Sequence, residues 1–580
     1  MTNKKFKLAA MSLATAVAVS AVGPSASAVT YYLGDGSVTV DQDGNGAFSY
    51  QVKEGESADG SNSKHTYVND DKAETGDGTI YVKDGNAPEV VPPTTDNSDN
   101  GTEVPIPTDN DTQSTDASGN NTENSSTSET APGNTITVKE GVKDATIVVD
   151  GVNVDTSTST DTPTEVSADT KEDKTIIKVG EGADVDLTVK DSNLTTGGNG
   201  IDIGVNLNGE DENKKTNVDL TLDNTKINLT ENATAGINAR DNSDVDITLK
   251  GDNTIDGSEA IDKVTEGGGH DISKDNVNIE GIRVGGEGAS DSSDASEGAN
   301  TKLTISGGVE KTETAETDTE ETESSAGGSL TISDTTGGLV MADGSDVGIT
   351  DGADVTIKDT KTSGAGQAGR AVTQHGDLTI SGGSSLTIDG VEDNNAPHTG
   401  IGIASWDEIT VEGGSTLDIS GATTGIYGHQ GSDASLTVED STLNISDVKR
   451  GIVYEGEGVD KEGHVHKSAG DITFDNAKVN IDADNIGITT GDNGTSSIKL
   501  DNTEAKITVG ERGYAIYGPD AGGKGDLDIA NSKLDIDASA YRAYGIMAGY
   551  KNVNIRDGSV VNSNSDAAGI ILTGRAGNAT

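Results

Sequence analysis

Five aromatic side chains in the second half of this sequence have the type and spacing of a sugar-binding surface. Tyr427, Tyr454 and Tyr544 lie beside a recurring Gly-Ile step, and Tyr517 follows the equivalent step Ala515-Ile516. Trp406, the only tryptophan, follows another Gly-Ile step. An aromatic ring offers a flat apolar face with a polar edge, which suits stacking on a sugar ring. The alternatives are a structural ladder of rings and tyrosines scattered over the surface.

Acidic side chains are the second group that could do chemistry. Asp475, Asp501 and Asp557 lie in polar bends of a repeat. Asp is favoured in bends for its local hydrogen bonds, whether or not it has a function. The eight arginines are scattered, and no cluster of Asp and Arg is evident. We therefore expect no enzyme activity and assign no catalytic residue.

Two short motifs resemble metal-binding sequences. Residues 41–46 match the first half of an EF-hand loop, but position twelve is Val52 instead of the bidentate Glu, so a hairpin turn is the simpler interpretation. His464 and His466 are two positions apart, as two metal ligands on one face of a strand would be, but no third ligand is nearby and a solvated loop is the simpler interpretation. The sequence leaves the metal ligands unknown, and calcium is the one cofactor that the acidic composition favours.

The charge balance excludes several kinds of partner. The chain has 99 acidic and 40 basic residues, a net charge of −59. Nucleic acid is excluded because its phosphates need Lys and Arg, and anionic membrane surfaces are disfavoured for the same reason. The chain has no cysteine and only 3% aromatic residues. Neither a disulfide framework nor a large conventional core is therefore expected.

The first 28 residues have the organisation of an export signal. Lys4, Lys5 and Lys7 precede an apolar run over residues 8–22, and Ala26-Ser27-Ala28 supplies a cleavage site. No later segment is apolar enough to span a bilayer. These features predict a bacterial protein that is secreted or lies on the cell surface.

Composition divides the rest of the chain into three parts. Residues 29–85 form a β-rich N-terminal cap segment, and residues 86–134 are so rich in Pro, Ser, Thr and Asp that we expect a disordered linker. A repeat region covers residues 135–580, with a low-complexity insertion near residues 310–327.

A unit of roughly 24–36 residues recurs in this region, a period typical of solenoids. Each copy has an alternating triplet, a polar bend, a second triplet and a Gly-Ile step, as in Leu436-Thr437-Val438, Leu443-Asn444-Ile445 and Gly451-Ile452. Alternation turns one side of each strand inward, and Gly or Asn permits a left-handed bend. We predict an all-β parallel β-helix of about thirteen coils, a rod on the order of 60 Å long.

The unit resembles the right-handed parallel β-helix of the pectate-lyase-like superfamily. The opening stretch, residues 30–40 (TYYLGDGSVTV), looks like that of Gram-positive surface proteins with a carbohydrate-binding β-helix, and autotransporter passengers and large adhesins share the coil. The resemblance implies a right-handed solenoid whose partner is an extracellular polysaccharide or a host surface glycan. Lyases of this fold combine calcium-binding carboxylates with a basic residue.

Residues and resemblance together favour a secreted, adhesin-like β-helix protein that binds carbohydrate through the four tyrosines and Trp406. A calcium-dependent polysaccharide lyase or hydrolase, or a degenerate relative, is one alternative, and a structural display stalk is another. No cap or anchor sequence follows the last Gly-Ile strand, residues 569–572. We therefore expect further coils beyond residue 580 in the natural protein.

Overall fold

The structure is a computed structural model. It describes residues 29–33, 37–42, 48–53, 79–84, 131–132, 134–157, 174–208, 214–261, 278–286, 300–308, 327–362, 369–392, 400–456, 458–459, 465–466, 468–491, 495–518, 524–573 and 578–579. The predicted signal peptide lies outside the described residues, as do nearly all of the predicted linker and of the low-complexity insertion.

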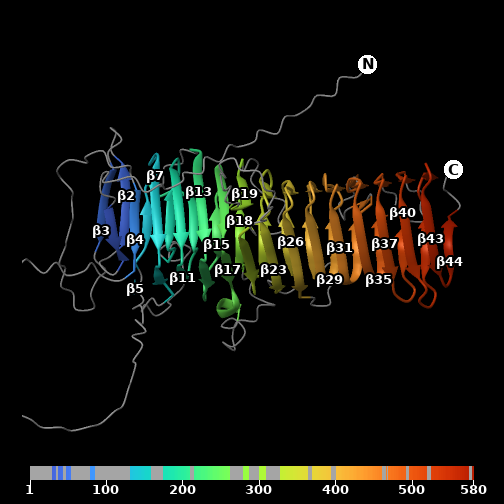
Figure 1. Cartoon of the computed structure of the whole chain (residues 1–580), viewed down its shortest axis with the longest axis horizontal. Helices are drawn as coiled ribbons and strands as arrows, with labels where there is room; N and C mark the ends of the chain where they lie inside the picture. Colours follow the sequence, from blue (N-terminus) through green and yellow to red (C-terminus); the bar gives the residue numbers. More distant parts are fainter. Residues whose placement is uncertain are drawn as a thin grey trace, which may run out of the picture.

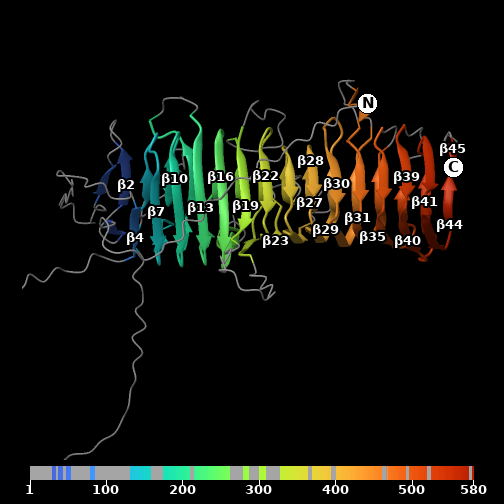
Figure 2. The same ribbon diagram turned by 45° about the horizontal axis from the view of Figure 1, so that its top comes forward.

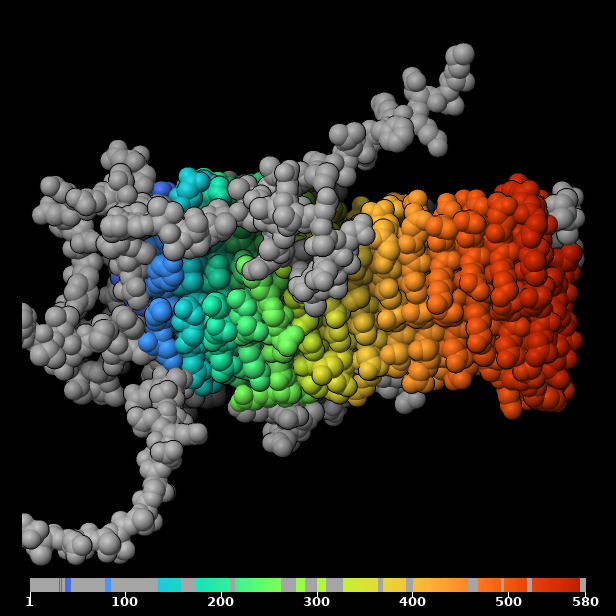
Figure 3. All heavy atoms as spheres, in the orientation of Figure 1, coloured from blue at the N-terminus to red at the C-terminus, as the bar shows by residue number. Residues whose placement is uncertain are grey.

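The chain winds into a rod of stacked coils, a parallel β-helix (Figure 1). The strand pairings arrange the strands in three rows along the rod. The turned view shows successive strands side by side along its length (Figure 2). The first row is a separate 16-stranded sheet, and the second and third rows together form a 27-stranded sheet. Along the surface in Figure 3, the colours follow the sequence from one end to the other, because each coil stacks directly on the one before it.

The first row consists of β1 (Val29–Tyr32), β4 (Thr79–Lys83), β7 (Ala145–Asp150), β10 (Asp184–Lys190), β13 (Thr216–Asp223), β16 (Ser243–Lys250), β19 (Lys302–Gly307), β22 (Asp346–Thr350), β25 (Leu378–Ile380), β28 (Glu408–Val411), β30 (Ser435–Glu439), β34 (Ile472–Asp475), β36 (Ile498–Asp501), β39 (Asp526–Ala530), β42 (Asn552–Arg556) and β45 (Asn578–Ala579).

The second row consists of β5 (Ala131–Pro132), β8 (Asn153–Asp155), β11 (Asn193–Thr196), β14 (Lys226–Leu229), β17 (Asp252–Asp256), β20 (Ser329–Ser333), β23 (Asp354–Thr360), β26 (Ser385–Val391), β37 (Glu504–Val509), β40 (Lys533–Ala538) and β43 (Val560–Ser565). Three long strands supply both the second and the third row of their coils: β29 (Thr416–Gly428), β31 (Thr442–Tyr454) and β35 (Lys478–Thr490).

The third row also contains β2 (Ser37–Gln42), β3 (Phe48–Lys53), β6 (Ile136–Val138), β9 (Ile177–Gly180), β12 (Ile201–Val205), β15 (Ala235–Ala239), β18 (Glu280–Val284), β21 (Gly337–Met341), β24 (Arg370–Gln374), β27 (Ile401–Ser405), β38 (Tyr514–Tyr517), β41 (Tyr544–Ala548) and β44 (Ala568–Leu572). A small separate hairpin pairs β32 (Gly458–Val459) with β33 (Val465–His466).

The N-terminal strands belong to the same sheets as the repeats. In the first row β1 pairs with β4 and β4 with β7, all in parallel. In the third row β2 pairs in parallel with β6 and antiparallel with β3. Asp41 and Gln42 end β2 opposite Ser49 and Phe48, which confirms the predicted hairpin at this segment. The thirteen first-row strands from β7 to β42 agree with the number of coils predicted from the repeat.

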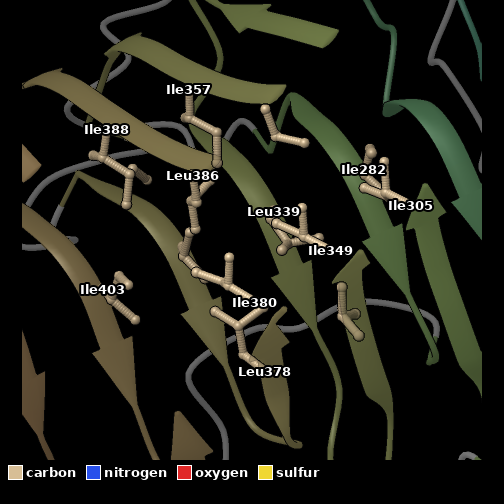
Figure 4. Packing of buried hydrophobic residues seen from close by; sticks show 14 of the residues in the cluster. Ile282, Ile305, Leu339, Ile349, Ile357, Leu378, Ile380, Leu386, Ile388 and Ile403 are labelled. Carbon is tan, nitrogen blue, oxygen red and sulfur yellow. The ribbon is translucent and has the colours of Figure 1, made fainter. Parts of the chain in front are cut away.

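The core is a column of aliphatic side chains from all three rows. Leu378, Ile409 and Leu436 occupy the same register position of consecutive first-row strands, and all three are buried. In Figure 4, Ile380, Leu386 and Ile403 of the three rows point into one interior. This packing confirms the predicted alternation in the first and second rows, where strands such as β25 and β26 bury every second residue at the start of the strand.

One detail of the predicted repeat is wrong. The sequence has two Gly-Ile steps in one coil, at residues 400–401 and 402–403, and the repeat pattern predicts that the first is the repeated step. In the structure Ile403 pairs with Ile426 of the next coil, whereas Ile401 pairs with Thr424. The inward residue is therefore Ile403, and Ile401 lies on the opposite side of the strand.

The bends between the first and second rows adopt the left-handed conformation that was predicted for them. Asn476 and Asn502 have φ values of 50° in equivalent bends, and Gly413 and Gly414 are also at positive φ. Small polar side chains complete these bends: Ser441 Oγ accepts a hydrogen bond of 3.1 Å from the N–H of Ser415 in the previous coil. Asn and Gly tolerate this conformation better than other residues, which explains their recurrence there.

Candidate functional site

The third row carries the predicted site residues, and its outward side is called the third-row face here. Each strand offers two outward positions, because the Gly-Ile step between them occupies two consecutive buried positions, as in Arg450-Gly451-Ile452-Val453. The first outward column contains Arg370, Ile401, Thr424, Arg450, Ile486, Tyr514 and Tyr544. The second contains Thr373, Ala404, Tyr427, Val453, Thr489, Tyr517 and Met547.

Trp406 is the middle ring of a three-ring stack. The ring centroids of His375 and Trp406 are 4.0 Å apart, those of Trp406 and His429 are 3.7 Å apart, and both pairs are nearly parallel. The guanidinium carbon of Arg370 lies 5.3 Å from the centroid of the Trp406 ring. Because a histidine covers each face of the indole, Trp406 has no face left on which a sugar could stack.

Tyr427 is held inside a small closed cluster on the third-row face. Its side chain is 2% exposed and its ring meets the edge of His429 at 4.6 Å. Its hydroxyl donates a hydrogen bond to Glu455, and burial followed by Glu455 raises the pKa of Tyr427. Ile401 and Ala404 are buried beside it, with Trp406 and Val453 packed against them. Tyr427 therefore contributes to packing at this place and offers no free ring.

Tyr454 does not belong to the predicted surface. It lies two positions after Ile452, so strand alternation turns it into the core, where it is fully buried. Gly428 of the previous coil makes room for it, since a Cβ atom there would lie 2.8 Å from Tyr454 Cδ1. Tyr550 is buried against Gly518 in the same way. The proposed role of Tyr454 in ligand binding is corrected to a role in core packing.

Tyr517 and Tyr544 remain accessible and form one cluster with two further tyrosines. Tyr514 and Tyr544 stack with centroids 5.0 Å apart, and Tyr514 and Tyr517 lie 5.1 Å apart at an interplanar angle of 47°. All three are half-buried, and Tyr541, in the bend before β41, is 54% exposed. We call Tyr514, Tyr517, Tyr541 and Tyr544 the tyrosine patch.

A buried charge network lies further along the third-row face and was missed from the sequence. Arg240 donates two hydrogen bonds to Asp202, of 2.9 and 2.8 Å, and Asn238 donates one of 2.9 Å to the same carboxylate. Arg283 binds Glu280 through two hydrogen bonds of 2.6 and 2.9 Å. Each carboxylate is engaged by a forked guanidinium. The bonds of Arg240 and Asn238 to Asp202 cross-link two coils, whereas Arg283 and Glu280 lie on the same strand, β18. The missed signal is that Asp202, Asn238 and Arg283 share one register position.

Three aspartates follow the His375–Trp406–His429 stack at the bends into the first row. Burial, and then the charge of Asp377, raise the pKa of Asp407 from its ordinary value to about 6, with Asp433 adding to the effect. Asp407 also shares a hydrogen bond with Asp377. Asp407 therefore keeps its proton under mildly acidic conditions, because its ionised form would be partly buried beside the carboxylate of Asp377.

No group of three or more His, Cys, Asp or Glu in the described ranges has the geometry of a metal site. Within the same ranges, no helix is long and apolar enough to cross a bilayer. In comparisons with family models, curated proteins and solved structures, the chain matches none of them. The fold therefore rests on the structure itself, and a functional assignment has to come from the site geometry.

Proposed function

We propose that this chain is an extracellular, surface-located binding protein that recognises glycans through the tyrosine patch. The single observation that carries the proposal is the stack of Tyr514 and Tyr544 beside Tyr517 on the outward side of consecutive coils. A folded chain gains little from leaving four tyrosines at the surface, whereas a ligand with apolar ring faces and hydroxyl groups uses both ends of a tyrosine.

The position of the patch supports a flat, extended ligand. Tyr544 is covered by a ring on the side of Tyr514, and its register partner on the other side is Ala568, which has no ring. Met547, the partner of Tyr517, adds an adaptable apolar contact. Consecutive coils repeat at about 4.8 Å, so the patch presents successive contacts along the rod axis.

The first test is the binding of a glycan array and of soluble polysaccharides by the wild-type chain and two variants. We expect Tyr517→Ala and Tyr544→Ala each to weaken binding about fivefold, since one ring contact is worth on the order of 1 kcal/mol. Tyr81→Ala is the matched control, because Tyr81 is a half-buried tyrosine on the first row, outside the third-row face. Equal losses in all three variants would contradict the proposal, and a chain that binds no glycan would fit a display stalk instead.

Secretion and surface location form part of the same proposal and rest on the sequence of residues 1–28. Cell fractionation of the natural host, with detection in the intact-cell and culture fractions, is the measurement. Retention of the protein in the cytoplasm would contradict the proposed extracellular role.

A second candidate function, glycan hydrolysis, is favoured by Asp407. Hydrolases of glycosidic bonds need a protonated carboxyl group as general acid, and a pKa raised to about 6 keeps the carboxyl of Asp407 protonated under mildly acidic conditions. The assay is release of reducing ends from the glycans that bind, between pH 4 and 8, by the wild type and by Asp407→Asn. Activity that survives the substitution, or no release at any pH, would exclude this site as a hydrolase.

A further inference from the structure

Two bends that lead from the second row into the third row have an unusual residue at their left-handed position. In the described part of the chain, sixteen residues other than glycine have positive φ, and fourteen of them are Asp or Asn. The other two are Arg512, with φ of 58°, and Arg542, with φ of 57°. Asp and Asn enter this conformation readily because their short side chains bond to the local backbone, an advantage that arginine does not have.

The two arginines occupy the same bend of consecutive coils. Arg512 N donates a hydrogen bond of 2.9 Å to Tyr541 O, and Tyr544 N donates one of 2.8 Å to Gly513 O. The two backbones are therefore about one strand spacing, roughly 4.8 Å, apart. Both residues are exposed, and like charges at this separation repel each other.

Within the described ranges, no carboxylate forms an ion pair with Arg512 or Arg542. Arg240, Arg283 and Arg556 each form an ion pair with an acidic side chain, whereas neither Arg512 nor Arg542 forms one. Asp566, in the next coil, accepts a hydrogen bond from the backbone N–H of Arg542 instead of binding its guanidinium. In a chain with 99 acidic residues, two adjacent arginines without an ion-pair partner need an explanation beyond folding.

Their place beside the tyrosine patch supplies that explanation. Arg542 lies over the ring of Tyr541, with its guanidinium carbon 5.2 Å from the ring centroid. Tyr514 and Tyr544 lie two positions after Arg512 and Arg542, respectively, and stack on each other. A guanidinium fork matches the geometry of a carboxylate or sulfate group, and the adjacent rings accept the sugar that carries it.

We propose that Arg512 and Arg542 make the tyrosine patch selective for acidic polysaccharides, whose anionic groups the two guanidiniums bind. The inference rests on the glycan-binding function proposed above and deepens it by naming the substrate class. The net charge of −59 repels anionic chains from the rest of the rod. The two arginines therefore localise an acidic chain at the patch.

The experiment measures binding of four polymers by the full chain: alginate, carboxyl-reduced alginate, dextran sulfate and unmodified dextran. We expect alginate or dextran sulfate to bind and its uncharged counterpart to bind at least tenfold more weakly, with affinity falling as salt rises. The carboxylate and sulfate arms show which anionic group is preferred. Equal binding of charged and uncharged polymers would overturn the acidic selectivity and leave glycan binding intact, whereas no binding of any polymer would overturn both.

The variant Arg512→Asn/Arg542→Asn separates a binding role from a structural one. Asn favours the left-handed bend, so the variant should melt at the same temperature as the wild type or higher, yet bind the acidic polymer roughly a hundredfold more weakly, about tenfold per lost guanidinium contact. Arg556→Gln is the control, because this arginine is bound to Asp528 and Asp557 on the first row, and its loss should leave binding unchanged. Wild-type affinity in the double variant would overturn the proposal.

Discussion

The position of each aromatic residue relative to the isoleucine of the Gly-Ile step decides its role. Tyr517 directly follows Ile516 and faces outward, whereas Tyr454 lies two positions after Ile452 and faces the core. Alternation alone could have predicted this difference from the sequence. The stack around Trp406 could not have been predicted, because its histidines come from two other coils and lie beyond the strand ends.

A single carboxyl group should make stability depend on pH. The pKa of Asp407 is raised to about 6 in the folded chain, above its ordinary value of 3.8, so the folded state holds the proton more tightly than the unfolded state. The stability that this carboxyl group contributes should therefore be fully present below about pH 4 and be lost as the pH rises through about 6. Asp407→Asn should remove this loss and stabilise the chain at pH 7 by about 1 kcal/mol, a value reduced for partial exposure.

Thermal melting of the wild type and Asp407→Asn between pH 4 and 8 is the measurement. The two melting temperatures should converge near pH 4 and separate by pH 7. A constant difference across this range would show that Asp407 does not keep a raised pKa.

The glycine of each Gly-Ile step explains why the third row departs from strict alternation. A Cβ atom at Gly451 would lie 2.7 Å from Ile481 Cγ2 and would also overlap the carbonyl oxygen of Gly487 in the next coil. The absence of a side chain lets two consecutive positions be buried. The repeat therefore predicted the rows and the inward isoleucines, but the burial of outward Ile401 and Asp202 depends on neighbouring coils that local alternation does not reveal.

The register of the second row predicts opposite effects for two adjacent residues. Ile481 is buried and pairs in register with Ile445 and Ile507, whereas Asp482 is exposed. Ile481→Asp places an unpaired carboxylate in the core and should cost roughly 4 kcal/mol or more. Asp482→Ala should change stability by less than about 0.5 kcal/mol. Denaturant unfolding followed by circular dichroism measures both, and comparable losses would mean that the register is wrong.

Across the whole molecule, regular stacking brings like charges into register. Asp186, Asp219 and Asp246 pair at one outward position of β10, β13 and β16. Burial, and then the charges of Asp186 and Asp246, raise the pKa of Asp219. Because stacked coils place equivalent residues above one another, the repulsion between like charges recurs from coil to coil. The net charge of −59 extends this repulsion along the rod.

Divalent cations should stabilise the rod by screening this repulsion. We expect the melting temperature to rise by a few degrees in millimolar calcium relative to sodium chloride of equal ionic strength, and to return to its starting value with a chelator. Because the described residues contain no cluster with the geometry of a metal site, the rise should be gradual with concentration, and magnesium should act almost as well as calcium. Asp219→Asn should reduce the response, since it removes the central charge of its column. Identical melting temperatures with calcium and with chelator would contradict the prediction, and a steep, saturable response to calcium alone would point to a specific binding site instead of general screening.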